Sequence, residues 1–116
     1  MSQLVEYLPE FLHSFASAAS AGVPPAHAIK LVPARELGPL REDVQRMVKY
    51  INWGDSSVEA VHKVERECGN NYLSRTMAVV RRACLAKGEI ADVLQVLATD
   101  ATQLRALKRE RALVKL

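Results

Sequence analysis

The chain has 116 residues, of which 49% are hydrophobic, 5% are aromatic and 25% are charged. This composition excludes a disordered chain, and the length is sufficient for one domain with an aliphatic core that requires neither metals nor disulfides. The net charge of +3 is too small for a strongly basic nucleic-acid-binding domain, but it is unevenly spread: residues 1–70 carry 7 basic and 9 acidic residues, a net charge of −2, and residues 71–116 carry 9 and 4, a net charge of +5.

Proline and glycine divide the chain into segments of helical length, and apolar residues within each segment recur at intervals of three and four. We expect the first helix to begin at Pro9, because proline suits the first turn of a helix and disfavours a helical conformation in the residue before it. Gly22 is expected to end this helix in a left-handed conformation, and Pro24-Pro25 to open a short second helix. The residues predicted to face inward are Leu8, Phe11, Leu12, Phe15, Ala18 and Ala19 in the first helix, and Ala28, Ile29 and Val32 in the second.

Two further helices are predicted between Gly38-Pro39 and Gly69. The third is expected to stop at Trp53-Gly54. The fourth has a capping-box sequence, in which the Ser56 hydroxyl accepts from the Glu59 amide and the Glu59 carboxylate accepts from the Ser56 amide. The apolar stripes are Leu40, Val44, Met47, Val48 and Ile51, followed by Val58, Val61, Val64 and Cys68.

The fifth helix is expected to be capped by Asn70 or Asn71 and to end at Gly88. Lys87 would lie in its last turn, where the helix dipole favours a positive charge. Its predicted apolar stripe is Leu73, Met77, Val80 and Cys84.

A sixth helix is predicted to start with Glu89 and Asp92 in its first turn, where the dipole favours acids. Its inward positions are Ile90, Val93, Leu94, Leu97, Ala101 and Leu104. The predicted fold is therefore all-α: a single domain over residues 1–116 in which six helices form an antiparallel bundle with short connections.

Basic residues gather near the end of this last helix, where Glu110 is the only acid after Leu104. They are Arg105, Lys108, Arg109, Arg111 and Lys115. No glycine, asparagine or proline follows to end the helix, so we expect residues from about 105 to 116 to lead into a membrane span, with the basic residues close to its cytoplasmic flank. A nucleic-acid-binding arm and a merely solvated helix face remain alternatives.

Motifs for catalysis or metal binding are not found in the sequence. His13, His27 and His62 fall on three different predicted helices, and no H-E-x-x-H, G-x-S-x-G, P-loop or G-x-G-x-x-G pattern occurs. We therefore predict that the domain is not an enzyme and holds no cofactor or metal.

Several other residues are given structural interpretations. Trp53 is expected to pack over one end of the bundle, in preference to acting as a binding hot spot. Glu6 and Glu10 are interpreted as solvating one face of the first helix. Cys68 and Cys84 lack C-x-x-C spacing and are expected to behave as small buried apolar residues.

Landmarks along almost the whole chain resemble the cytoplasmic domain of the type II secretion system F family, the platform proteins of type II secretion, type IV pilus and archaellum machines. The landmarks are Leu8-Pro9 with Phe11-Leu12, Ala21-Gly22-Val23-Pro24, Trp53-Gly54 with Ser57-Val58-Glu59-Ala60, and Lys87-Gly88-Glu89 with Leu94 and Leu97. Asp92 stands where the bacterial pattern usually has a second glycine. The stretches Ile51–Gly54 and Leu107–Arg111 look more like the platform proteins of the archaellum and of archaeal pili.

The resemblance implies a non-enzymatic platform at the cytoplasmic face of the cell membrane. Its cytoplasmic domain would contact a hexameric secretion ATPase, and its membrane helices would receive pilin-like subunits; a homodimer is also implied. The candidate contact residues for the ATPase are Arg81, Arg82, Lys87 and Glu89. The alternatives are a small helical nucleic-acid-binding module that uses the basic last helix, or a soluble helical adaptor that binds partner helices in an apolar groove.

Overall fold

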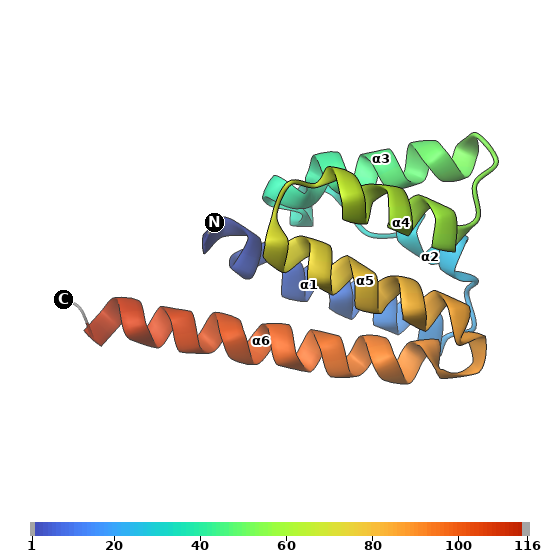
Figure 1. The fold of residues 1–116 in the computed structure, drawn as a ribbon. Helices are drawn as coiled ribbons and strands as arrows, with labels where there is room; N and C mark the ends of the chain where they lie inside the picture. Colours follow the sequence, from blue (N-terminus) through green and yellow to red (C-terminus); the bar gives the residue numbers. More distant parts are fainter. Residues whose placement is uncertain (1, 115–116) are drawn as a thin grey trace.

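The computed structural model describes residues 2–114, and this part of the chain contains six α-helices and no strand (Figure 1). The prediction of an all-α bundle is therefore confirmed. Three short 3-10 turns, which the sequence did not suggest, cover Ala34–Glu36, Gly38–Leu40 and Lys87–Glu89. The helices are α1 Ser2–Ser20, α2 Pro25–Lys30, α3 Arg41–Asn52, α4 Ser57–Glu67, α5 Asn71–Leu85 and α6 Ile90–Val114.

The predicted start of the first helix at Pro9 is wrong, because α1 already begins at Ser2 and Pro9 lies inside it. The proline ring lacks the N–H that would bond to the Val5 carbonyl, so α1 forgoes one hydrogen bond there. Burial compensates for this loss: Val5 is 6% exposed and Leu8 is fully buried. Tertiary packing thus outweighs the local preference that proline expresses.

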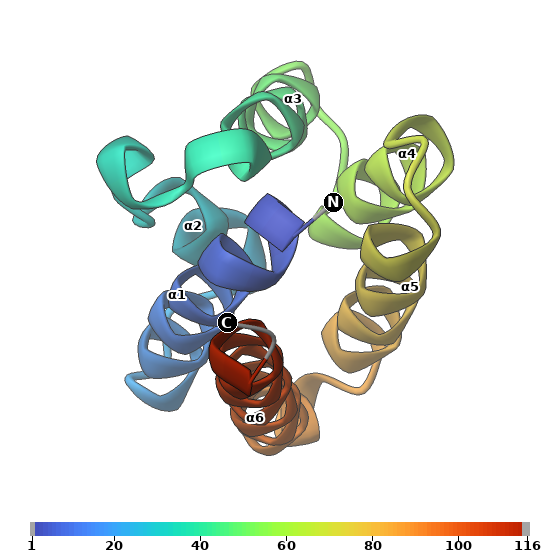
Figure 2. The ribbon, with the colours of Figure 1, turned by 90° about the vertical axis from the view of Figure 1, so that its left-hand side faces the viewer.

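The core is one continuous cluster to which all six helices contribute. Phe11 and Phe15 lie at its centre and meet edge to face, with ring centroids 5.9 Å apart. Figure 2, which looks along the bundle, shows the helices arranged around this interior, with α1 beside α6 and α4 beside α5. Most predicted apolar stripes point inward, although Val93, Leu97 and Leu104 of α6 are only half-buried.

The predicted helix caps are largely confirmed. Ser56 and Glu59 form both bonds of the capping box, at 3.1 and 2.8 Å, and the Asn70 side chain accepts from the Leu73 amide at 2.9 Å. Gly22 and Gly54 have φ of +85° and +113° and follow α1 and α3. Local sequence signals therefore set most of the helix boundaries.

The turn between α5 and α6 differs from the prediction. The fifth helix ends at Leu85, so Lys87 and Gly88 belong to a 3-10 turn instead of the last turn and stop of α5. Glu89 also lies in this turn, just before α6, while Asp92 occupies the first turn of α6 as predicted. The Ala86 amide closes α5 by donating to the Arg82 and Ala83 carbonyl oxygens, and Gly88 does not have a positive φ.

The bundle has two distinct ends, visible in Figure 1. At one, which we call the turn end, the connections α1–α2, α3–α4 and α5–α6 lie together, at residues 21–24, 53–56 and 86–89. The other, the exit end, contains the first turns of α1, residues 34–40 and the last turns of α6. Since α6 projects past its neighbours at the exit end, the molecule is 49 Å long but only about half as wide.

Candidate functional site

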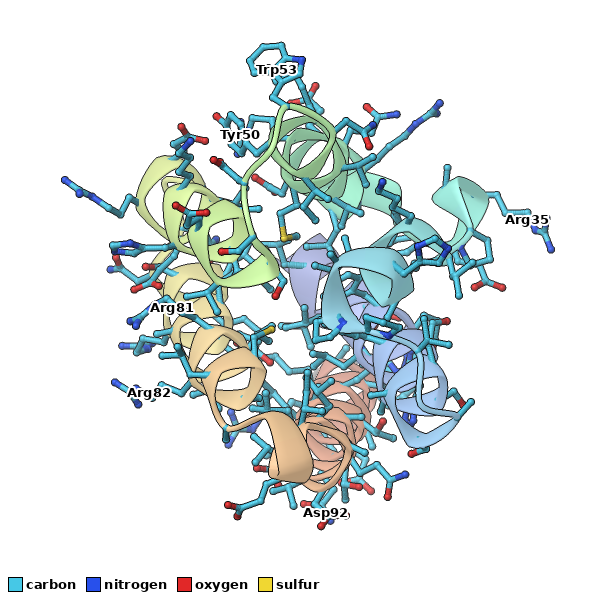
Figure 3. All side chains as sticks on the ribbon, turned by 90° about the vertical axis from the view of Figure 1, so that its right-hand side faces the viewer. Arg35, Tyr50, Trp53, Arg81, Arg82 and Asp92 are labelled. Carbon is cyan, nitrogen blue, oxygen red and sulfur yellow. The ribbon has the colours of Figure 1, made fainter. Side chains whose placement is uncertain are left out.

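The four predicted contact residues for a partner lie at or near the turn end, but they are not equivalent. Arg82 and Glu89 are exposed, while Arg81 is half-buried and donates from Nε to Glu65 of α4 at 2.8 Å. Figure 3, which looks onto the turn end, shows Arg81 and Arg82 on the outer side of α5. The Lys87 side chain lies outside the part of the chain that the structure describes.

The bond to Glu65 gives Arg81 a structural role. This hydrogen bond raises the pKa of Arg81 above its ordinary value, because it stabilises the charged guanidinium. The pair connects the C-terminal half of α5 to α4, so replacing Arg81 would disturb the bundle as well as any contact with a partner. Arg82 is the better-exposed cation for binding.

A hollow of about 460 Å³ opens at the turn end, between the α1–α2 connection, the start of α4 and the α5–α6 turn. Most of its lining is apolar, including Val23, Val58 and Ile90. Cys84 lies on its wall, only 5% exposed, and burial raises the pKa of its thiol. The interpretation of Cys84 as a small buried apolar residue is thus confirmed, whereas Cys68 is only half-buried.

Trp53 does not pack over the end of the bundle, and the prediction that it would is wrong. Trp53, in the α3–α4 connection, is 74% exposed. Figure 3 shows its ring projecting away from the bundle. Its neighbours are the Tyr50 ring, with centroids 6.5 Å apart, and the Lys49 ammonium, 5.1 Å from the Trp53 centroid. The adjacent Gly54 has a φ of +113°, a left-handed conformation that ends α3 directly after the tryptophan.

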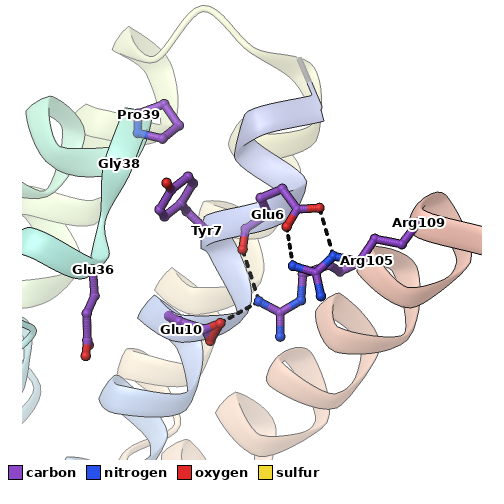
Figure 4. Close-up of a pocket in the computed structure, with 8 residues that line it drawn as sticks. All are labelled: Glu6, Tyr7, Glu10, Glu36, Gly38, Pro39, Arg105 and Arg109. Atoms are coloured by element: carbon purple, nitrogen blue, oxygen red, sulfur yellow. Dashed lines mark hydrogen bonds and ion pairs between the residues drawn. The ribbon is translucent and has the colours of Figure 1, made fainter. Parts of the chain in front are cut away.

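The exit end has its own cluster of charges, in which arginines of α6 bind acids of α1 (Figure 4). Arg105 donates to the Glu10 carboxylate at 2.5 Å and to the Glu6 carbonyl oxygen at 3.0 Å. Arg109 forms two bonds with the Glu6 carboxylate, of which the Nε bond measures 3.2 Å. We call Glu6, Glu10, Arg105 and Arg109 the clamp.

The clamp changes the interpretation of Glu6 and Glu10, which the sequence suggested were merely solvating α1. The hydrogen bond from Arg109 lowers the pKa of Glu6 below its ordinary value, since it stabilises the carboxylate. A signal for the clamp was present in the sequence: acids four residues apart on one helix match arginines four residues apart on another. Only the fold shows that these helices run antiparallel side by side.

The predicted membrane-proximal basic residues differ in whether they take part in the clamp. Arg105 and Arg109 bind α1, whereas Lys108 is half-buried and Arg111 is exposed. Lys115 lies outside the described residues. Around the clamp, a cavity of about 690 Å³ extends to Glu36 and to the Gly38-Pro39 turn, which packs against Tyr7.

The clamp is one part of a longer polar seam between α1 and α6. His13 shares a hydrogen bond with Thr102 at 3.1 Å, and Gln95 donates to Ser20 at 3.2 Å. Within residues 2–114, no group of three or more histidine, cysteine or acidic side chains is placed to hold a metal ion. The seam therefore joins α1 to α6 at several points along their contact.

Comparisons with known proteins found a family match and a relative of this chain. The sequence model of the family described as Type II secretion system (T2SS), protein F matches residues 11–116. The chain is also 25% identical over 109 residues to an uncharacterised protein of Methanocaldococcus jannaschii. This alignment covers 94% of the chain but only 18% of that relative. No solved structure matches significantly.

Among residues 2–114, no helix is both long and apolar enough to cross a membrane. The family match nevertheless extends over nearly all of the bundle, including the α5–α6 turn and the clamp arginines. The agreement in sequence over this length, together with the six-helix fold, leads to one conclusion: the chain belongs to the type II secretion system protein F family.

Proposed function

We propose that this chain is the cytoplasmic domain of a membrane platform protein in a secretion or pilus-type machine. In this role it transmits motion from a hexameric ATPase to membrane helices that receive pilin-like subunits. Membership of the protein F family supports a platform in machinery of this type. The domain acts as a scaffold and not as an enzyme.

The geometry of α6 is the observation that carries this proposal. Its 25 residues correspond to about 37 Å at 1.5 Å per residue. The helix runs from the turn end to the exit end, where its last turns project past the neighbouring helices. Its contact with α1 is the most extensive between any two elements, and the clamp closes that contact near the exit end. A push at the turn end would therefore reach the exit end through one stiff pair of helices.

The two ends receive different partners in this arrangement. The exit end faces the membrane, with Lys108 and Arg111 near anionic headgroups. The turn end, at the opposite pole, faces the cytoplasm and the ATPase. The relative from Methanocaldococcus jannaschii, an archaeon, supports the archaellum or archaeal pilus branch over the bacterial secretion branch.

The nucleic-acid alternative is not favoured by the structure. It requires a basic α6 with free charges, but Arg105 and Arg109 are bonded to acids of α1. Neutralising phosphates with these arginines would mean breaking the clamp. The adaptor alternative gains no specific observation either, so neither is proposed.

Binding of the cognate ATPase to the full-length protein in nanodiscs tests the proposal. Arg82→Glu changes an exposed cation near the turn end, and Arg75→Glu is a matched control: it is exposed on nearly the same face of α5, two turns closer to the exit end. We expect Arg82→Glu to weaken binding and Arg75→Glu to leave it nearly unchanged. Absence of any binding by the wild-type protein would overturn the proposed function.

A further inference from the structure

The lone tryptophan of the chain is unusually placed for its size. Trp53 is 74% exposed, whereas Phe11 and Phe15 are at most 1% exposed. A large exposed aromatic side chain forgoes the burial that normally stabilises it, and such residues are enriched where proteins bind one another.

The indole is also held in place. Its partner Tyr50 donates from its hydroxyl to both oxygens of the Glu67 carboxylate at 2.8 Å. The Lys63 ammonium lies 4.9 Å from the Tyr50 ring and is itself fixed by Asp55 at 2.6 Å. Because these contacts join α3 to α4, the Trp53 ring is supported before any partner arrives, which reduces the entropy lost on binding.

Lys49 adds a positive charge to this surface. Its ammonium lies 5.1 Å from the Trp53 centroid and 5.5 Å from the Tyr50 centroid. Within residues 2–114, aromatic rings and not carboxylates are its close neighbours, in contrast to Lys63, Arg81, Arg105 and Arg109. A complementary partner surface would therefore present a carboxylate beside an apolar side chain.

We propose that Trp53 and Lys49 form an anchor by which the turn end holds the ATPase. This inference rests on the proposed function and specifies the chemistry of the partner: an apolar residue that packs on the indole, next to an Asp or Glu that pairs with Lys49. The anchor comprises the last turn of α3, with Lys49, and the start of the α3–α4 connection, with Trp53, at the same end as Arg82 and the apolar hollow. Trp53 supplies contact area, and Lys49 supplies charge selectivity.

The test measures the affinity of the cognate ATPase for full-length protein in nanodiscs. Trp53→Ala and Lys49→Glu should each weaken binding at least about tenfold, whereas Lys49→Arg should retain it. Leu113→Ala is the matched control, because this apolar side chain is 69% exposed but lies at the exit end. Thermal unfolding of each variant should match that of the wild type, since Trp53 contributes little to the core.

The outcomes separate this inference from the proposed function. If the wild type binds the ATPase and Trp53→Ala binds equally well, the anchor is wrong and the platform role stands. If Trp53→Ala weakens binding but Lys49→Glu does not, the acidic partner surface is wrong. Sedimentation of the same variants gives a third outcome: loss of self-association with unchanged ATPase affinity would make a second copy the occupant and overturn the proposal.

Discussion

Arginines at the exit end of the bundle are paired with acids, whereas prominent side chains at the turn end are exposed. At the exit end, Arg105 and Arg109 bind Glu10 and Glu6, so side chains that look available in the sequence hold α6 against α1. At the turn end, Arg82 and Trp53 remain exposed. The difference shows that the sequence alone does not tell which charged or aromatic residues the fold leaves exposed, and only these are candidates for binding a partner.

Two glycines, one at each end, also differ in the space beside their Cα atoms. A Cβ added at Gly38 would lie 2.7 Å from the Tyr7 ring, whereas one added at Gly22 would meet nothing within 4 Å. Gly38 is therefore closely packed against Tyr7 of α1, whereas Gly22 in the α1–α2 connection has open space beside it.

The largest expected effect comes from a core substitution in α6, the helix that runs between the two ends. Leu94 of α6 is fully buried in the common core. Leu94→Ala should lower the free energy of unfolding by about 2–5 kcal/mol, since it leaves a cavity beside α1 and α5. Denaturant unfolding measures this, and Val96→Ala, at a 61% exposed position of the same helix, should change it by no more than about 0.5 kcal/mol. Equal effects of the two substitutions would contradict the assignment of the core.

A second substitution tests the difference in packing between Gly38 at the exit end and Gly22 at the turn end. Both Gly38 and Gly22 have positive φ, +50° and +85°, so alanine strains the backbone at either position. We expect Gly38→Ala to lower the free energy of unfolding by about 2–3 kcal/mol, because it also displaces Tyr7, and Gly22→Ala by about 1–2 kcal/mol. Adding Tyr7→Ala to Gly38→Ala should recover part of the loss. If it recovers none, the close approach of Tyr7 is not the cause.

The smallest effect concerns the pH dependence of the clamp. Because Arg109 lowers the pKa of Glu6 in the folded state, the pair stabilises the fold above the ordinary value of 4.5 and loses this contribution as pH falls through the folded-state pKa. The stability difference between wild type and Glu6→Gln should therefore shrink on acidification from pH 6 to pH 3. Both groups are exposed, so the difference should also fall with added salt. A difference independent of pH would argue against the clamp.

The sequence predicted the helices better than their contacts. The caps at Ser56 and Asn70 depend on neighbours three residues away, so local reasoning identified them. Pro9 was misjudged because burial of the preceding turns, a tertiary effect, stabilises a helix that proline locally disfavours. Local signals cannot include such distant contributions.

The candidate site also combines features set by local sequence with contacts that only the fold reveals. The partner of Arg105 lies 95 positions away in the sequence, and only the antiparallel alignment of α1 and α6 brings the two together. The exposure of Trp53 likewise depends on how the α3–α4 connection leaves the bundle. The predicted turn-end residues stay predictions, with Arg81 now given a structural role and Arg82 left as the available cation.

Amide hydrogen exchange of the full-length protein, with and without the cognate ATPase, tests the division between the two ends most directly. The account predicts slower exchange on binding in the turn-end connections, residues 21–24, 53–56 and 86–89. Residues 36–40 and 105–109 should exchange at the same rate in both states. Protection confined to these exit-end segments, with the three turn-end connections unchanged, would contradict the account.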